Sequence, residues 1–301
     1  MAPRTSMTAK LLASIVLCAA AWAQSQPQPK VLIVTSSGVE PYQQAVKSMT
    51  ASLREAGIRP QTVEISVDGN EVLIVAAMQG GPYKAVVAVG PEARWSIGKA
   101  GVKVPVISTM MFLSDLEEEV NQGRETPVHQ AGAVYLDADP VSVAKQLREA
   151  FPELRRAGFL VAPDQNIDAW KSAFAKQKFV VVTAESPRRA DLVKTFVPLK
   201  GKVDFLVCVP TAKLYSAQSI EALLHASADK NLPVVGFSQS FLQAGAAAAV
   251  YASHESIGVQ TAALVRRLAA GAKVVEDETA QKVELHMNTR VLRAMGLRAS
   301  N

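Results

Sequence analysis

Short runs of β-branched and aliphatic residues alternate with amphipathic segments along almost the whole chain, and this alternation constrains the fold more than any other feature. The apolar runs are Val31–Val34, Val86–Val89, Val106–Ile107, Ala131–Val134, Phe159–Val161, Phe179–Val182, Phe205–Val209 and Val234–Phe237. Such unbroken runs fit strands buried on both faces, as in a parallel sheet covered by helices. Between them, apolar residues recur at helical spacing, as at Ile220, Leu223 and Leu224. The pattern predicts a doubly wound α/β architecture.

The alternation restarts near the middle of the chain. The first set of runs ends near Leu136, and a second set begins at Phe159. In the break between them, Asp139 fits a helix N-cap and Pro140 fits the first helical position. We therefore predict two doubly wound parallel-sheet lobes joined by a hinge. The first lobe spans residues 30–136 and the second begins at Asp137.

The first 23 residues predict an exported protein. Arg4 and Lys10 give a positive start to an apolar run that ends at Ala21–Ala23, an A-x-A cleavage pattern. The run is shorter than the roughly 20 residues of a membrane span. We expect a cleaved signal peptide over residues 1–23, a disordered lead over residues 24–29 and a periplasmic location. An uncleaved membrane anchor is the alternative.

Charge and cysteine content narrow the function classes. Cleavage leaves 278 residues, which is enough for two cores. The formal charge of +5 for the whole chain is scattered and forms no basic stripe, so we do not expect nucleic acid as a partner. Cys208 is the one cysteine left after cleavage, and its apolar neighbours predict a small buried side chain.

The common catalytic motifs are absent from the sequence or incomplete in it. Thr35–Gly38 follows the first run where a dinucleotide enzyme would carry G-x-G-x-x-G. Gly236–Ser240 begins like a nucleophile elbow but lacks the second glycine. His254–Glu255 does not continue into H-E-x-x-H. We therefore expect a protein that is not an enzyme and uses no cofactor or metal, with an exported enzyme as an alternative.

Loops that follow strands form the candidate ligand site, because open α/β sheets bind ligands beyond the carboxyl ends of their strands. The candidate ligand-binding residues are Ser36, Ser37, Gly90, Glu92, Thr109 and Met110 in the first lobe, and Asp164, Asn166, Pro210, Thr211, Ser238 and Ser240 in the second. Pro91 and Pro210 each predict a helix start, where free backbone N–H groups favour an anion. Met110, Met111 and Phe112 could give an apolar wall.

Several segments carry a family resemblance. Leu232–Ala246 resembles the "iPvfg…sfv.aGal" stretch of ABC transporter substrate-binding proteins related to the tryptophan/tyrosine-type binding protein. Segments elsewhere are similar to the same family in order along the mature chain: Pro105–Ile107, Gly132–Leu136, Ile257–Ala262 with Gly271, and Asn288 with Leu292 and Ala294–Leu297. The resemblance is strongest from Val203 onward.

The resemblance implies a type I periplasmic-binding-protein fold and capture of a small solute for the membrane permease of an ABC importer. It places three crossings between the lobes, near Asp137, Ser253 and Val274. Residues 253–273 would then return to the first lobe, and residues 274–301 would belong to the second. We expect a monomer. A periplasmic sensor for a membrane receptor or kinase is the alternative function.

The sequence departs from the family at two loops. Ser238–Ser240 is uncharged where many relatives have an acidic residue, and Met110–Phe112 replaces a polar pattern. Glu92, Asp115 and Asp164 are candidates to supply the missing charge. The expected ligand is an amino acid or a more apolar organic solute.

Overall fold

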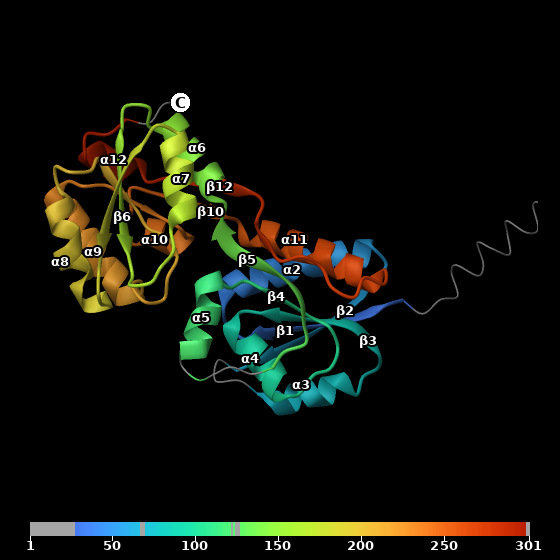
Figure 1. Cartoon of the computed structure of the whole chain (residues 1–301). Coiled ribbons are helices and arrows are strands. Elements are labelled where there is room, and N and C mark those ends of the chain that lie inside the picture. Colours follow the sequence, from blue (N-terminus) through green and yellow to red (C-terminus); the bar gives the residue numbers. More distant parts are fainter. Residues whose placement is uncertain (1–27, 67–69, 122, 124–126, 299–301) are drawn as a thin grey trace, which may run out of the picture.

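The computed structural model describes residues 28–298 except 67–69, 122 and 124–126, and it forms two α/β lobes (Figure 1). The predicted signal peptide and residues 24–27 of the predicted lead lie outside the described residues. In the part of the chain that is described, no helix combines the length and the apolar character that a membrane span requires.

The first lobe is built on a parallel sheet of strand order β11-β5-β4-β3-β1-β2. Its strands are β1 (Lys30–Ser36), β2 (Arg59–Ile65), β3 (Tyr83–Val89), β4 (Val106–Thr109), β5 (Gln130–Ala138) and β11 (Glu278–Ala280). Its helices are α2 (Glu40–Glu55), α3 (Glu71–Met78), α4 (Pro91–Lys99), α5 (Leu113–Asn121) and α11 (His254–Ala269). Val31 and Ile33 belong to one apolar cluster while Leu32 and Val34 belong to another, so β1 is buried on both faces as predicted.

The second lobe repeats this arrangement with the order β12-β10-β9-β8-β6-β7. Its strands are β6 (Arg156–Val161), β7 (Val180–Glu185), β8 (Phe205–Val207), β9 (Val234–Gly236), β10 (Ala248–Ala252) and β12 (Val283–Met287). Its helices are α6 (Pro140–Ala150), α7 (Asp168–Lys176), η1 (Arg189–Asp191), α8 (Leu192–Phe196), η2 (Val197–Leu199), α9 (Ala217–Lys230), α10 (Gln239–Gln243) and α12 (Thr289–Ala294). The one departure is β12, which pairs antiparallel with β10. The predicted architecture of two doubly wound lobes is confirmed.

The chain passes between the lobes at three places. It leaves the first lobe after β5, where Asp139 caps α6 by accepting a hydrogen bond from the N–H of Ser142, and it returns between β10 and α11. The third crossing was expected near Val274, which is wrong. Val275 packs in the core of the first lobe and β11 pairs with β5, so the crossing lies at Gln281–Lys282.

Helix α11 returns from the second lobe and packs on α2 (Figure 1). Gly258 allows the close approach, because a Cβ there would lie 2.2 Å from the carbonyl oxygen of Ala45. The Ser48 hydroxyl also donates a hydrogen bond to the carbonyl of Glu255 at 2.9 Å. Helix α11 is therefore part of the first lobe, although it follows β10 of the second lobe in the chain.

Candidate functional site

Loops after equivalent strands of the two lobes meet across the cleft. Phe112 follows β4 of the first lobe and Phe237 follows β9 of the second, and their rings form an edge-to-face contact with centroids 5.2 Å apart. Such an aromatic contact is favourable beyond its buried area. The two sets of strand-end loops therefore lie close enough for one small molecule to touch both.

A hollow of about 490 Å³ lies where these loops face each other. Its lining includes Leu113 and Ser114 from the start of α5 in the first lobe, and Asp137 from the first crossing. The second lobe supplies the remaining lining residues, which are Asp164, Gln165, Asn166, Asp168, Ala169, Trp170, Val209, Pro210, Thr211 and Lys213. This volume is within the range of pockets that hold small molecules.

The charge of this hollow is predominantly negative. Asp137, Asp164 and Asp168 line it together with the single cation Lys213. Asp168 is paired with Lys171 at 3.2 Å, whereas Asp164 has no hydrogen-bond or ion-pair partner among the described residues. The exposed Asp164 has a left-handed backbone with φ of 63°, a conformation that aspartate tolerates better than most residues.

Side-chain hydrogen bonds fix the loop after β6. The amide of Gln165 accepts from the N–H of Ala162 at 3.0 Å and donates to the carbonyl of Pro210 at 3.3 Å. The Asn166 side chain accepts from the N–H of Asp168 at 2.9 Å. Trp170 packs against Phe159 with ring centroids 6.4 Å apart. The second lobe thus presents a preformed wall that is polar at the loops and aromatic at Trp170.

Four of the sequence-predicted residues meet in this hollow: Asp164, Asn166, Pro210 and Thr211. The helix start predicted at Pro210 is wrong, because α9 begins at Ala217 with Ser216 as its N-cap. Thr211 instead accepts a hydrogen bond from the N–H of Lys213 at 3.3 Å in a turn. The prediction failed because proline marks turns as well as helix starts.

Two residues of the first lobe that were predicted to contact ligand are core residues. The hydroxyl of Thr109 is fully buried and lies 2.8 Å from the hydroxyl of Thr261 in α11. Met110 is buried in the apolar cluster between the sheet and α11, with a left-handed φ of 58°. These side chains hold the helix and sheet together, so the structure corrects the prediction for both.

The remaining candidates of the first lobe lie at the ends of β1 and β3. Ser36 is buried and its hydroxyl has no hydrogen-bond partner among the described residues, while Ser37 is exposed. Gly90 is the N-cap residue of α4, which begins at Pro91 as predicted, and a Cβ on Gly90 would lie 2.5 Å from the hydroxyl of Tyr42. Burial raises the pKa of Tyr42, and the nearby carboxylates of Glu92 and Asp115 raise it further. Tyr42 therefore stays protonated beside Glu92.

Ser238 and Ser240 lie at the start of α10, beyond Phe237. Ser238 is the N-cap residue but makes no side-chain capping bond, and Ser240 is exposed. Neither lines the hollow described above. Both follow the carboxyl end of β9, next to Phe237, whose ring contacts Phe112.

Sequence reasoning did not select Leu113, Ser114, Trp170 or Lys213 as candidate site residues. Leu113 is half exposed at the start of α5, and an exposed apolar side chain of this size often marks a contact surface. Trp170 gave no signal, because it falls on an ordinary amphipathic helix.

Cys208 is buried next to Val209, which lines the hollow. Burial raises the pKa of the Cys208 thiol to about 12, so this cysteine is inert, in agreement with the predicted buried side chain. Within the described ranges, no cluster of three or more histidine, cysteine, aspartate or glutamate residues could hold a metal ion.

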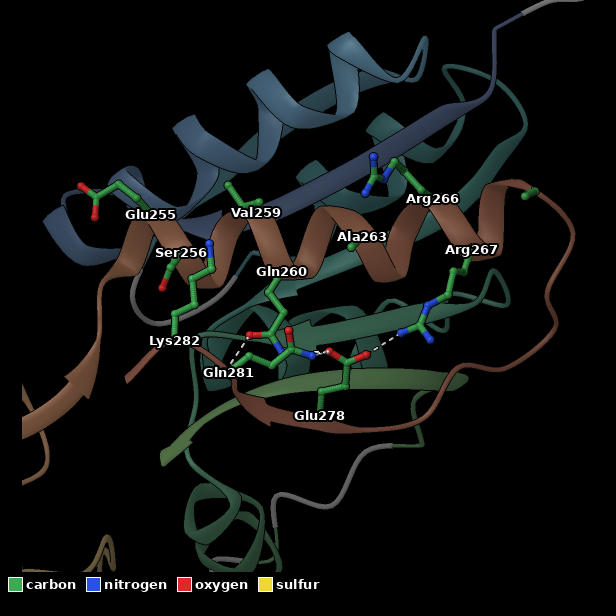
Figure 2. Close-up of a pocket in the computed structure, with 11 residues that line it drawn as sticks. Glu255, Ser256, Val259, Gln260, Ala263, Arg266, Arg267, Glu278, Gln281 and Lys282 are labelled. Carbon is green, nitrogen blue, oxygen red and sulfur yellow. Dashed lines mark hydrogen bonds and ion pairs between the residues drawn. The ribbon is translucent and has the colours of Figure 1, made fainter. Parts of the chain in front are cut away.

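A second hollow, of about 730 Å³, lies on the outer side of α11 (Figure 2). Its lining includes Gln260 and Arg267 of α11, Glu278 of β11, and Gln281 and Lys282 of the third crossing. Glu278 accepts hydrogen bonds from Gln260, Gln281 and Arg267, so much of its polar surface is already paired. We therefore assign the candidate ligand site to the hollow between the lobes.

Comparison with known proteins agrees with the fold. A sequence model of the family described as ABC transporter substrate binding protein matches residues 30–301. No curated protein sequence matches the chain.

Solved structures share the fold at low sequence identity. The ligand-free, open structure of a substrate binding protein with adhesive properties from Clostridium difficile has a TM-score of 0.68 and 15% identity, covering 91% of this chain and 96% of that one. A conserved domain protein from Vibrio cholerae has a TM-score of 0.60 and 17% identity, with coverages of 91% and 97%. An ABC domain from Streptococcus pneumoniae in complex with L-Trp has a TM-score of 0.57 and 12% identity, with coverages of 90% and 96%.

Proposed function

Because the chain belongs to the ABC transporter substrate binding protein family and has the type I periplasmic-binding-protein fold, we propose that it captures a small solute between its lobes and delivers it to an ABC importer. The family and the similar structures are binding proteins rather than enzymes. The single observation that carries the proposal is the hollow lined by both lobes and by Asp137 of a crossing segment.

The lining favours a solute that combines a positively charged group with an apolar portion. Asp137, Asp164 and Asp168 outnumber Lys213, and a charged hydrogen bond to a carboxylate is stronger than a neutral one. Leu113 and Trp170 offer apolar surface on opposite sides of the cleft. An amino acid or amine with an apolar side chain fits these features.

The mechanism is a shift of population rather than a chemical step. A solute that touches both lobes binds the closed arrangement better and therefore increases its population. The closed surface is then what the importer recognises. We also propose export by the signal peptide over residues 1–23, since capture for an importer takes place outside the cytoplasm.

A thermal-shift screen tests the proposal. Amino acids, amines, D-ribose, D-arabinose and myo-inositol are offered to the purified protein, and a solute at about 100 times its Kd stabilises the folded state by about 2.7 kcal/mol. The matched variant Thr211→Trp fills the hollow and is expected to lose the shift, whereas Ser37→Trp changes an exposed residue that does not line it. A screen in which no small molecule raises the melting temperature would contradict solute capture.

A further inference from the structure

One glutamine of the first lobe bonds to the backbone just before the third crossing. The side-chain amide of Gln260 in α11 donates to the carbonyl of Thr279 at 3.0 Å and accepts from the N–H of Gln281 at 3.2 Å. Figure 2 shows this side chain reaching from α11 toward Gln281, which directly follows β11. These two partners are backbone groups, and the same amide also donates to the Glu278 carboxylate at 2.8 Å, so the interaction holds the path of the chain at the end of the first lobe.

A glutamine of the second lobe repeats the pattern just after the crossing. The amide of Gln146 in α6 donates to the carbonyl of Val283 at 3.1 Å and accepts from the N–H of Leu285 at 2.8 Å. Each glutamine amide thus donates to the carbonyl of one residue and accepts from the N–H of the residue two positions later. A residue of a neighbouring parallel strand pairs with a strand in the same way.

The strands held in this way are the outer strands of their sheets. β11 ends the first sheet and β12 ends the second. The outward N–H and C=O groups of an edge strand have no ladder partner and would otherwise bind water or another strand. Each glutamine amide therefore replaces one residue of a missing neighbouring strand.

The backbone groups bound by Gln260 and by Gln146 belong to residues on either side of Lys282. Gln281 is held through its N–H and Val283 through its C=O, and Val283 is also paired with Ala252 at the second crossing. Lys282 is exposed and has no hydrogen-bond or ion-pair partner among the described residues. A hinge needs a few residues whose backbone angles are free to change.

We propose that Gln146 and Gln260 are positioning residues that confine rotation at the third crossing to Lys282, so that the lobes open and close about a fixed pivot. The inference concerns the empty protein and goes beyond solute capture. It holds whether the chain serves an importer or a sensor, because both need a defined closing motion.

The test measures the distance between the lobes in the ligand-free full chain. Fluorescent labels are placed at Lys47→Cys on α2 and Glu221→Cys on α9, in a Cys18→Ser background, and the buried Cys208 does not react. The single-molecule distance distribution is compared for the unsubstituted chain, Gln146→Leu, Gln260→Leu and the double variant. Gln43→Leu is the matched control, because Gln43 is an exposed glutamine whose side chain has no hydrogen bond among the described residues.

We expect each single variant to broaden the distribution and the double variant to broaden it most, with no change for Gln43→Leu. Amide exchange at Gln281 and Leu285 should accelerate about tenfold in the corresponding variant, as for the loss of a hydrogen bond worth about 1.4 kcal/mol. Gln146→Asn and Gln260→Asn, which stay polar but are one methylene shorter, should act in the same way and serve if the leucine variants do not fold.

An unchanged distance distribution in the double variant, with accelerated exchange, would overturn the proposal and leave the glutamines with a role in edge protection alone. Unchanged exchange at both amides would overturn it as well. Because no solute is present, these outcomes are independent of the thermal-shift screen, and a protein that binds nothing could still satisfy them.

Discussion

In the first lobe, the loops after β3 and β4 are packed into the fold, whereas in the second lobe the loops after β6 and β8 line the hollow. Gly90 lies against the ring of Tyr42 and Thr109 is bonded to α11. In the second sheet, Asp164 after β6 and Thr211 after β8 line the hollow. Two sheets with the same strand order therefore differ in whether the residues at their strand ends pack into the lobe or line the hollow.

The difference follows from what covers each sheet. Helix α11 returns from the second lobe to pack on α2 and β4, so the first lobe encloses residues near the carboxyl ends of its strands. The second lobe has β12 added antiparallel at its edge instead. We propose that the second lobe, which supplies most of the residues that line the hollow, carries more of the ligand contacts than the first.

The largest expected effect concerns the packing of the first lobe. Gly90→Ala should destabilise the protein by about 3 kcal/mol, because the new methyl group meets the ring of Tyr42 at a positive φ of 89°. Urea unfolding gives the free energy. Gly38→Ala is the control, since its φ is 73° but no atom lies within 4 Å of the new Cβ, and backbone strain alone costs about 1 kcal/mol. Equal losses for both variants would show that the cleft edge of the first lobe is not tightly packed.

The second prediction concerns the charge of the second lobe. Asp164→Asn keeps a side chain that tolerates the left-handed φ but removes the charge. Binding of a positively charged solute found by thermal shift should weaken about tenfold, as for the loss of a charged hydrogen bond, while the melting temperature of the empty protein stays the same. Calorimetric titration gives the Kd. Asp168→Asn, whose carboxylate is already paired with Lys171, should weaken binding less, and the reverse order would contradict the assignment.

Variants of two threonines, one in each lobe, test the difference between the lobes further. Thr109→Val removes the bond to Thr261, whose hydroxyl still donates to the carbonyl of Ile257, so stability should fall by about 1 kcal/mol with ligand affinity unchanged. Thr211→Val should cost less stability but reduce affinity. Parallel urea unfolding and calorimetric titration of both variants decide the question. If Thr109→Val lowered affinity more than Thr211→Val did, the result would contradict the proposal that the second lobe carries more of the ligand contacts.

The smallest expected effect is a difference between two arginine–carboxylate pairs in how their contribution to the free energy of unfolding depends on pH. Burial raises the pKa of Glu119 above its ordinary 4.5, and its partner Arg94 offsets this only in part. For Asp204, burial acts in the same direction, but hydrogen bonds from Arg156 and two backbone amides outweigh it and lower the pKa below 3.8. Glu119 has one bond from Arg94 and a second oxygen without a partner, which explains the contrast.

The signs are therefore opposite. The contribution of Glu119 to the free energy of unfolding falls as pH rises above 4.5, because ionisation of Glu119 is harder in the folded state than in the unfolded state. Asp204 contributes stability above 3.8 that is lost as pH falls through its folded pKa. The free energy of unfolding is measured against pH for the unsubstituted protein, Glu119→Gln and Asp204→Asn. The difference between the unsubstituted protein and each variant should change in opposite directions between about pH 3 and about pH 7. Parallel slopes would contradict this account.

Features set by local sequence could be predicted, and features set by distant contacts could not. The strand runs, Asp139 as an N-cap and the buried Cys208 each depend on neighbouring residues and are confirmed. The contact of Thr109 with Thr261 joins residues 152 positions apart, so no local pattern could show that Thr109 is a core residue. The same is true of Gln146 and Gln260, whose spacing from the third crossing carries no periodic signal.

Hydrogen exchange of the unsubstituted protein, with and without the solute that gives the largest thermal shift, tests the central claim most directly. The account predicts new protection at residues 162–168 and 209–213 of the second lobe together with residues 113 and 114 of the first, since these line the hollow. Protection confined to the outer side of α11 and to residues 278–282, around the hollow of Figure 2, would contradict it.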